Sequence, residues 1–197
     1  MSSATISVAA SAHDASEEGP GTGFTATGVT VLAYSSATAG QWWYCGMLFV
    51  APIPQGSTIV SATLTVKAYS IGFDDVRANV GLEDVDNADD FTTNADVTTR
   101  ISSITTAGTT WEADSLGASD LVFNSPDISA PVQEVVDRPG WVAGNNMVVL
   151  FATDNQNPQK RLSMRAWDDA TEPEPKLNVS WRTPTAVTGS LLLLGVG

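Results

Sequence analysis

The chain has 197 residues, with 9 Lys and Arg against 22 Asp and Glu and a formal net charge of −13. Its length fits one domain, and a hydrophobic fraction of 43%, with 6 Trp and 6 Phe, is enough for a core, which excludes wholesale disorder. The acidic balance excludes proteins that bind nucleic acid or anionic membranes, because both need clustered Lys and Arg.

The chain contains one cysteine, Cys45, and one histidine, His13. One cysteine forms no internal disulfide, and a catalytic triad would have to use His13, in a polar N-terminal stretch. Adjacent carboxylates such as Asp168 and Asp169 point to opposite faces of a strand, whereas glycoside hydrolysis needs two carboxyl groups in one cleft. We therefore expect no enzymatic activity. Residues 1–12 lack the basic start and apolar run of a secretory signal peptide, so we expect synthesis in a cytoplasm.

Short β-branched and aromatic runs, bounded by Gly, Pro, Asn and Asp, recur along the chain, while helical periodicity is almost absent. In chain order the expected strands are residues 6–9, 29–32, 42–50, 59–70, 79–83, 119–123, 147–153, 162–167 and 177–181. From Val60 to Ala68, apolar side chains alternate with Ser, Thr and Lys, which predicts one buried and one solvated face. This pattern predicts an all-β fold, an antiparallel β-sandwich or jelly roll.

One segment, residues 129–138, shows the spacing of a short amphipathic helix instead. Ser129 is a typical N-cap, Pro131 suits the first turn, and the Arg-Pro-Gly sequence from Arg138 ends the helix. Its apolar face contains three valines at helical spacing: Val132, Val135 and Val136. We expect this one short helix to lie across an end of the sandwich, with Trp141 packed where it ends.

Arg182 is the last charged residue, which divides residues 1–182, one sandwich domain, from a neutral apolar tail, residues 183–197. An exposed apolar strand aggregates unless something covers it, so we expect the tail to dock or to mediate oligomerisation. A disordered terminus is the alternative. The expected assembly contacts are Leu191, Leu192, Leu193, Leu194 and Val196, in a homo-oligomer for which a trimer is one suitable form.

Four segments, in order and spacing, resemble DNRLRE-type β-sandwich domains, which are relatives of carbohydrate-binding modules. Residues 49–64, FVAPIPQGSTIVSATL, resemble a strand opening of that family, and residues 126–145, PDISAPVQEVVDRPGWVAGN, resemble its helix and turn. Residues 81–91, GLEDVDNADDF, and residues 175–181, PKLNVSW, are similar to an intermediate element and to the closing strand. This chain departs from the family at Met47, where many relatives have Arg, and at residues 166–169.

The resemblance implies a β-sandwich and two biological settings. In this family the domain occurs as a module of large secreted or cell-surface proteins and as a stand-alone chain in tailed-phage genomes. A lone module resembles the phage setting, so the leading hypothesis is a non-enzymatic virion protein that decorates the capsid or forms part of a fibre or neck. Its expected location is the virion, and its expected partners are other copies and other virion proteins.

Two groups of carboxylates are candidate ligands for a structural calcium ion. No other feature of the sequence indicates a cofactor. Residues 84–90 could present several oxygens to a hard cation, but they lack the Gly and the final Glu of an EF-hand loop, and a solvated acidic turn is the alternative. Their candidate ligands are Asp84, Asp86, Asp89 and Asp90. Jelly rolls related to the family often hold calcium where the terminal strands meet, which here implies Asp14, Glu17, Glu18, Asp168 and Asp169, with Glu17 and Asp168 foremost.

Aromatic residues provide the rival hypothesis, a module that binds a bacterial surface glycan or receptor. Trp42 and Tyr44 share one face of an expected strand, Trp43 takes the other, and an exposed indole packs well on a sugar ring. Trp42, Tyr44 and Trp111 are the candidate ligand residues, although each of the isolated tryptophans also suits a core. A fragment of a bacterial adhesin is a third possibility.

Overall fold

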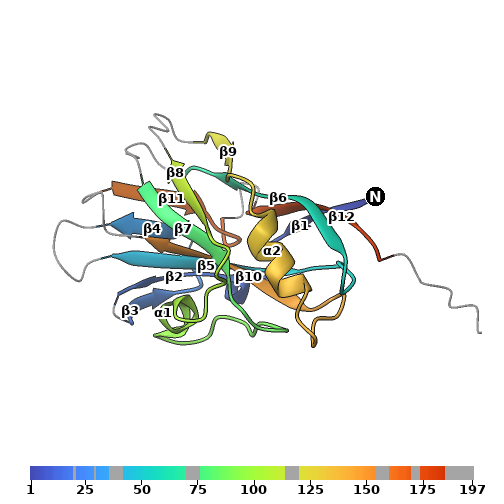
Figure 1. Cartoon of the computed structure of the whole chain (residues 1–197). Coiled ribbons are helices and arrows are strands. Elements are labelled where there is room, and N and C mark those ends of the chain that lie inside the picture. Colours follow the sequence, from blue (N-terminus) through green and yellow to red (C-terminus); the bar gives the residue numbers. More distant parts are fainter. Residues whose placement is uncertain are drawn as a thin grey trace, which may run out of the picture.

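The structure is a computed structural model, and it describes residues 1–19, 21–28, 30–35, 42–69, 76–113, 120–153, 160–169 and 174–184. Two antiparallel sheets contain most of these residues and pack their inner faces against each other, as Figure 1 shows. The all-β antiparallel sandwich expected from the sequence is confirmed.

The smaller sheet brings the first and last strands together. Its order is β1 (Ser2–Ser7), β12 (Lys176–Arg182), β6 (Thr58–Lys67) and β9 (Val122–Asn124). β1 pairs with β12 along its whole length, from Ser2 opposite Trp181 to Ser7 opposite Lys176.

The larger sheet is centred on β5 and β10. Its order is β11 (Lys160–Arg165), β4 (Thr30–Ser35), β5 (Trp43–Val50), β10 (Asn146–Thr153), β7 (Val76–Leu82) and β8 (Thr109–Ala113). β2 (Asp14–Glu18) pairs with β5, from Asp14 opposite Met47 to Glu18 opposite Trp43, and with β3 (Thr22–Thr25). A 3-10 turn, η1 (Ser11–His13), leads into β2.

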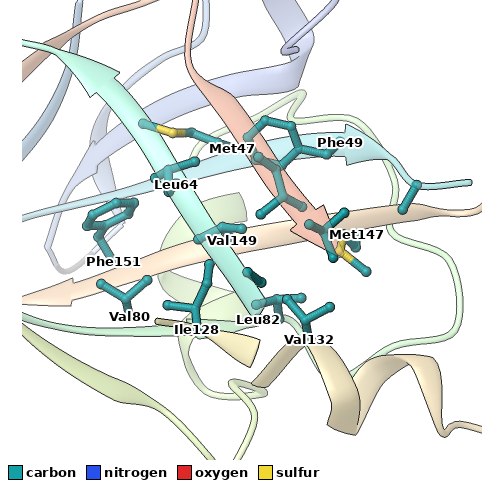
Figure 2. Close-up of a cluster of buried hydrophobic side chains, with 14 of the residues drawn as sticks. Met47, Phe49, Leu64, Val80, Leu82, Ile128, Val132, Met147, Val149 and Phe151 are labelled. Carbon is teal, nitrogen blue, oxygen red and sulfur yellow. The ribbon is translucent and has the colours of Figure 1, made fainter. Parts of the chain in front are cut away.

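The main core lies between the two sheets and consists of fully buried apolar side chains (Figure 2). They come from β5, β6, β7 and β10 and from the start of the helix region: Met47, Phe49, Leu64, Val80, Leu82, Met147, Val149, Phe151, Ile128 and Val132. A fully buried side chain of this kind stabilises the fold by about 1.5–3 kcal/mol.

A second, smaller apolar cluster covers the other face of β5 and β10. Leu48 and Leu150 point into it, and Phe91 and helix α1 (Asp96–Ile101) close it. Both faces of these strands are therefore buried, which explains why they read as continuous apolar runs rather than as alternating ones. Glycine is required at position 46, because a Cβ on Gly46 would lie 2.5 Å from the Phe91 ring.

The expected helix is α2 (Ser129–Val136), and it packs against β6 of one sheet and β7 of the other. Its N-terminus differs from the expectation, because Ser129 is a helical residue and has no capping role. The Asp127 carboxylate accepts hydrogen bonds from the N–H and the Oγ of Ser129, at 3.0 and 2.8 Å. Trp141 is buried beyond the helix, and its Nε1 donates to the carbonyl oxygen of Ile53 at 2.8 Å.

Each expected strand overlaps an observed one, but β2, β3, β8 and α1 are not predicted by the sequence pattern. β2 has no apolar alternation, since Asp14, Ser16 and Glu17 are buried polar residues. The alternation along β6 also fails at one end. A β-bulge opposite Ser180 and Trp181 shifts the register there, so that Ile59 is buried and Val60 is exposed.

Within the described ranges no helix is long and apolar enough to cross a membrane. The expected assembly residues lie outside these ranges: Leu191, Leu192, Leu193, Leu194 and Val196. Their docking role therefore stays a prediction.

Candidate functional site

The acidic segment, residues 84–90, is fixed by the turn that follows α2. Arg138 donates its Nε to Asp86 Oδ1 at 2.7 Å and its Nη1 to Asp84 Oδ1. Gly140 makes room for this contact, because a Cβ there would lie 2.1 Å from Asp86 Oδ2. The Asn146 N–H donates to Asn87 Oδ1 at 2.8 Å. The Arg-Pro-Gly-Trp motif thus anchors the acidic segment to the core.

Asp89 and Asp90 remain exposed beside an open polar depression of about 580 Å³, which Asp96 and Arg100 also line. Arg100 is already bound, since its guanidinium donates to Glu83 Oε2 and to the Asp90 carbonyl oxygen, both at 3.0 Å. Burial raises the pKa of Glu83, although the Arg100 charge opposes that shift. Among the residues that the structure describes, no group of three His, Cys, Asp or Glu side chains is arranged to hold a metal ion. Calcium at the four expected ligands Asp84, Asp86, Asp89 and Asp90 therefore stays a prediction.

Glu17 caps the first turn of α1. Its side chain is fully buried, and one carboxylate oxygen accepts the N–H of Ala95. The other oxygen accepts the N–H of Thr98 at 2.9 Å and its Oγ1 at 3.2 Å. Both oxygens of Glu17 therefore receive donors from the chain, and its expected role as a calcium ligand stays a prediction.

Asp14 and Asp168 do come together, as the second calcium hypothesis requires. Asp14 is 1% exposed, and its Oδ2 accepts the N–H of Trp167 at 2.8 Å. Asp168 Oδ1 accepts the Oγ–H of Ser11 at 2.7 Å. The remaining oxygens, Asp14 Oδ1 and Asp168 Oδ2, are buried without a hydrogen-bond partner among the described residues. Burial raises the pKa of Asp14 to about 7. The negative charge of Asp168 also raises this pKa, whereas the hydrogen bond from the Trp167 N–H lowers it.

These two orphaned oxygens fit a hard cation such as calcium. Calcium takes six to eight oxygen ligands, so two carboxylates would need further carbonyl or water ligands. The other expected members of this group have different partners or positions: Asp169 binds Arg165, and Glu18 is a partly exposed residue at the end of β2. Calcium at Asp14 and Asp168 remains a prediction of the family resemblance, and the geometry here is compatible with it.

The expected aromatic ligand residues are largely occupied by the chain itself. Trp111 is 5% exposed and packs on Phe123 and Phe151, with ring centroids 5.6 and 5.7 Å apart, so it cannot stack on a sugar. Trp42 is half-buried against Gly19, where a Cβ would lie 2.1 Å from its Nε1. Tyr44 packs against the second apolar cluster, and burial raises its pKa. The sugar-binding expectation is wrong for Trp111 and has little support at Trp42 and Tyr44.

A different aromatic surface lies at the end of β11, and we name it the β11 platform: Tyr69, Asp120, Arg165 and Trp167. Tyr69 is 40% exposed and Trp167 is 42% exposed. The Arg165 guanidinium lies 5.2 Å from the centre of the Tyr69 ring. Arg165 donates to Asp120 Oδ1 at 2.5 Å and also to Asp169 Oδ2. One exposed aromatic ring, Tyr69, therefore lies against an arginine that is held in place, and a second exposed aromatic residue, Trp167, follows two positions after that arginine.

The platform is assembled where the two sheets meet. Ala68 forms a bridge with Met164, and the N–H of Tyr69 donates to the carbonyl oxygen of Ser163 at 3.0 Å, which joins the end of β6 to β11. The N–H of Asp120 donates to the carbonyl oxygen of Ala68 at 3.0 Å. Asp120 has a φ of 69°, a left-handed conformation that Asp tolerates better than most residues. Three distant segments supply the platform, so no local motif could have revealed it.

No protein-family model matches the chain, and no curated protein matches it. Among solved structures, a family 35 carbohydrate binding module from Clostridium thermocellum is similar, with a TM-score of 0.37 and 9% sequence identity. The match covers 91% of this chain and 98% of that chain. A likeness with so low a TM-score and identity carries no argument about ligand, activity or family. The resemblance to DNRLRE-type domains therefore stays a prediction of the sequence.

Proposed function

We propose that this protein is a non-catalytic glycan-binding β-sandwich whose ligand lies on the β11 platform. The observation that carries the proposal is the exposed Tyr69 ring, which lies against the fixed Arg165, together with the exposed Trp167 two residues further along the chain. Tyr and Trp are enriched at binding interfaces, because each combines a large apolar ring with a polar group that can form a hydrogen bond. Trp, Tyr and Arg are also the residue types that contribute most to binding energy.

The platform has the chemistry that a sugar needs. The apolar C–H face of a pyranose packs on an aromatic ring, and its hydroxyl groups bind charged and polar side chains. Arg165 and Asp120 hold each other, so little side-chain entropy is lost when a ligand binds. Leu121, 44% exposed and next to Asp120, extends the apolar surface.

An affinity gel containing bacterial surface polysaccharides tests this proposal. Retention of the wild type should weaken about tenfold or more in Tyr69→Ala and in Trp167→Ala, since an aromatic hot spot contributes ~2 kcal/mol. The matched control is Val142→Ala, which shortens an exposed apolar side chain next to Trp141. Equal retention of all four proteins would sink the proposal.

The role in a tailed-phage virion remains a prediction that the platform neither requires nor opposes. It depends on the tail, of which residues 185–197 lie outside the described ranges. The absence of enzymatic activity and the formation of a homo-oligomer also remain predictions.

A further inference from the structure

We infer that the β11 platform selects a neutral sugar with adjacent hydroxyl groups, held by the Asp120 carboxylate, and discriminates against anionic sugars. The inference rests on the proposed glycan-binding function and adds the chemical class of the ligand.

The charge of Arg165 is already matched inside the protein. Its guanidinium binds two carboxylates, Asp120 and Asp169. Lys67, a second cation beside the platform, also lies near Asp120, with its Nζ 3.7 Å from Oδ1. A ligand carboxylate here would compete with two carboxylates of the chain for the Arg165 guanidinium. The protein as a whole, at a net charge of −13, adds further repulsion.

The two carboxylates around Arg165 have different exposure, which separates their roles. The Asp169 side chain is 9% exposed, so it holds the arginine from the buried side. The Asp120 side chain is 52% exposed, and both cations reach the same oxygen, Oδ1. The proposed contact for the ligand is therefore the other oxygen of this half-exposed carboxylate, Oδ2.

Asp120 is suited to accept hydrogen bonds from sugar hydroxyls. The hydrogen bond from Arg165 lowers the pKa of Asp120, so the carboxylate is ionised at neutral pH and acts only as an acceptor. Adjacent hydroxyl groups on a pyranose can both donate to one carboxylate. Hydrogen bonds to a charged acceptor are about twice as strong as neutral ones. Arg165 contacts both the Tyr69 ring and Asp120, which places this acceptor in the same cluster as the aromatic ring.

The position of Asp120 is determined by the backbone rather than by the side chain alone. The Ala68 N–H donates to the Leu121 carbonyl oxygen at 2.9 Å, and the Asp120 N–H donates to the Ala68 carbonyl oxygen at 3.0 Å. These two bonds fix residues 120–121 against the strand that leads to Tyr69. The acceptor and the aromatic ring therefore belong to one rigid unit.

The test is a competition assay in which the wild type is bound to a polysaccharide that retains it. Neutral sugars and the corresponding uronic acids, which differ only by oxidation at C6, are compared as competitors. The neutral member of each pair should compete at least about tenfold better, on the scale of one charge-assisted hydrogen bond. An acid that competes equally well or better would overturn the inference while the glycan-binding function stands. A wild type retained by no polysaccharide, neutral or acidic, would overturn the glycan-binding function itself, and the inference with it.

The variant Asp120→Asn tests the named residue. It keeps the size of the side chain and one carbonyl oxygen but loses the charge, so neutral-glycan binding should fall about tenfold. Asp89→Asn, at an exposed acid beside α1, is the matched control and should bind as the wild type does. The NMR signals of the Tyr69 ring report whether its contact with Arg165 survives the substitution. Their chemical shifts should be unchanged in Asp120→Asn without ligand. Full binding by Asp120→Asn, with those signals unchanged, would contradict the role of Asp120.

Discussion

Two arginines of this protein each bind two carboxylates, yet their surroundings differ. Arg138 binds Asp84 and Asp86 in the turn after α2. Two neighbours of this cluster contribute to the fold: Gly140 leaves room for Asp86, and Trp141 is buried. Arg165 instead lies against the exposed Tyr69, near the exposed Trp167.

The difference teaches that an ion-pair cluster does not by itself indicate a binding site. The Arg138 cluster lies within the RPGW motif that dominates the family resemblance, and its role is structural. The Arg165 cluster belongs to no recognisable motif, and it is the one that presents aromatic surface to solvent. The expected hierarchy is therefore that changes around Arg138 alter stability, whereas changes on the β11 platform alter binding.

The largest loss of stability should follow substitution of Trp141, the buried residue that ends the Arg-Pro-Gly-Trp motif. Trp141→Ala removes a side chain that is 1% exposed, together with its hydrogen bond to Ile53. The free energy of unfolding should fall by about 3–5 kcal/mol, as for other large aromatic deletions in cores. Urea denaturation followed by circular dichroism measures this loss. A loss below about 1 kcal/mol would contradict a structural role for the motif.

The next effect concerns Asp14 and depends on pH. Its pKa in the fold, about 7, lies above the ordinary value of 3.8, so the folded protein holds the proton more tightly than the unfolded chain. The stabilisation is complete below about pH 4 and is lost as the pH rises through about 7, with an upper bound of ~4 kcal/mol. In chelator, the wild type should lose stability across this range relative to Asp14→Asn, which does not titrate.

Addition of calcium to the same experiment tests whether an ion binds at Asp14 and Asp168. An ion bound at Asp14 and Asp168 would favour both ionised carboxylates, so added calcium should restore stability at pH 7 in the wild type but not in Asp14→Asn. Identical pH profiles for the wild type and the variant in chelator would show that Asp14 is not the titrating group.

A smaller effect is expected for Arg138→Met. Its ion pairs are partly exposed, so the free energy of unfolding should fall by only about 1–2 kcal/mol. Glycan retention should not change. Arg182→Met, at an exposed position on β12, is the matched control and should stay within about 0.5 kcal/mol of the wild type. Weakened glycan retention in Arg138→Met would break the division between the two regions.

The smallest effect on stability should follow removal of residues 183–197. Thr183 and Pro184 are exposed at the end of the sandwich, so the free energy of unfolding should change by less than about 1 kcal/mol. If the tail mediates assembly, native mass spectrometry should show a loss of oligomers. An oligomer of unchanged size would reject the docking role of the tail.

The sequence pattern predicted the fold wherever side-chain chemistry and burial agree. The alternation along β6 and the spacing of Val132, Val135 and Val136 in α2 both follow the core. Prediction failed where burial and polarity diverge. β2 was missed because Glu17 and its neighbours are polar yet buried. Trp111 was expected at a glycan site, because nothing in its local sequence shows that β8 turns it toward Phe123 and Phe151.

The site was less predictable than the fold. The family resemblance grouped Asp14 with Asp168, and the two do lie near each other, Asp14 at the start of β2 and Asp168 just after β11; their role as calcium ligands stays a prediction. Tyr69, Asp120 and Arg165 come from separate strand ends, and only the packing of the two sheets brings them into contact. Spacing along a chain predicts which residues share a face of one element, but not which ends of three elements meet.

The most direct test of the account follows the tryptophan indole N–H signals in NMR while the retained glycan is added. Trp167 on the β11 platform and Trp141 below Arg138 then report on the two regions in one titration. We predict that the Trp167 signal shifts in proportion to bound glycan while the Trp141 signal does not move. A Trp167 signal that stays unchanged at saturation would contradict the assignment of the β11 platform as the ligand site.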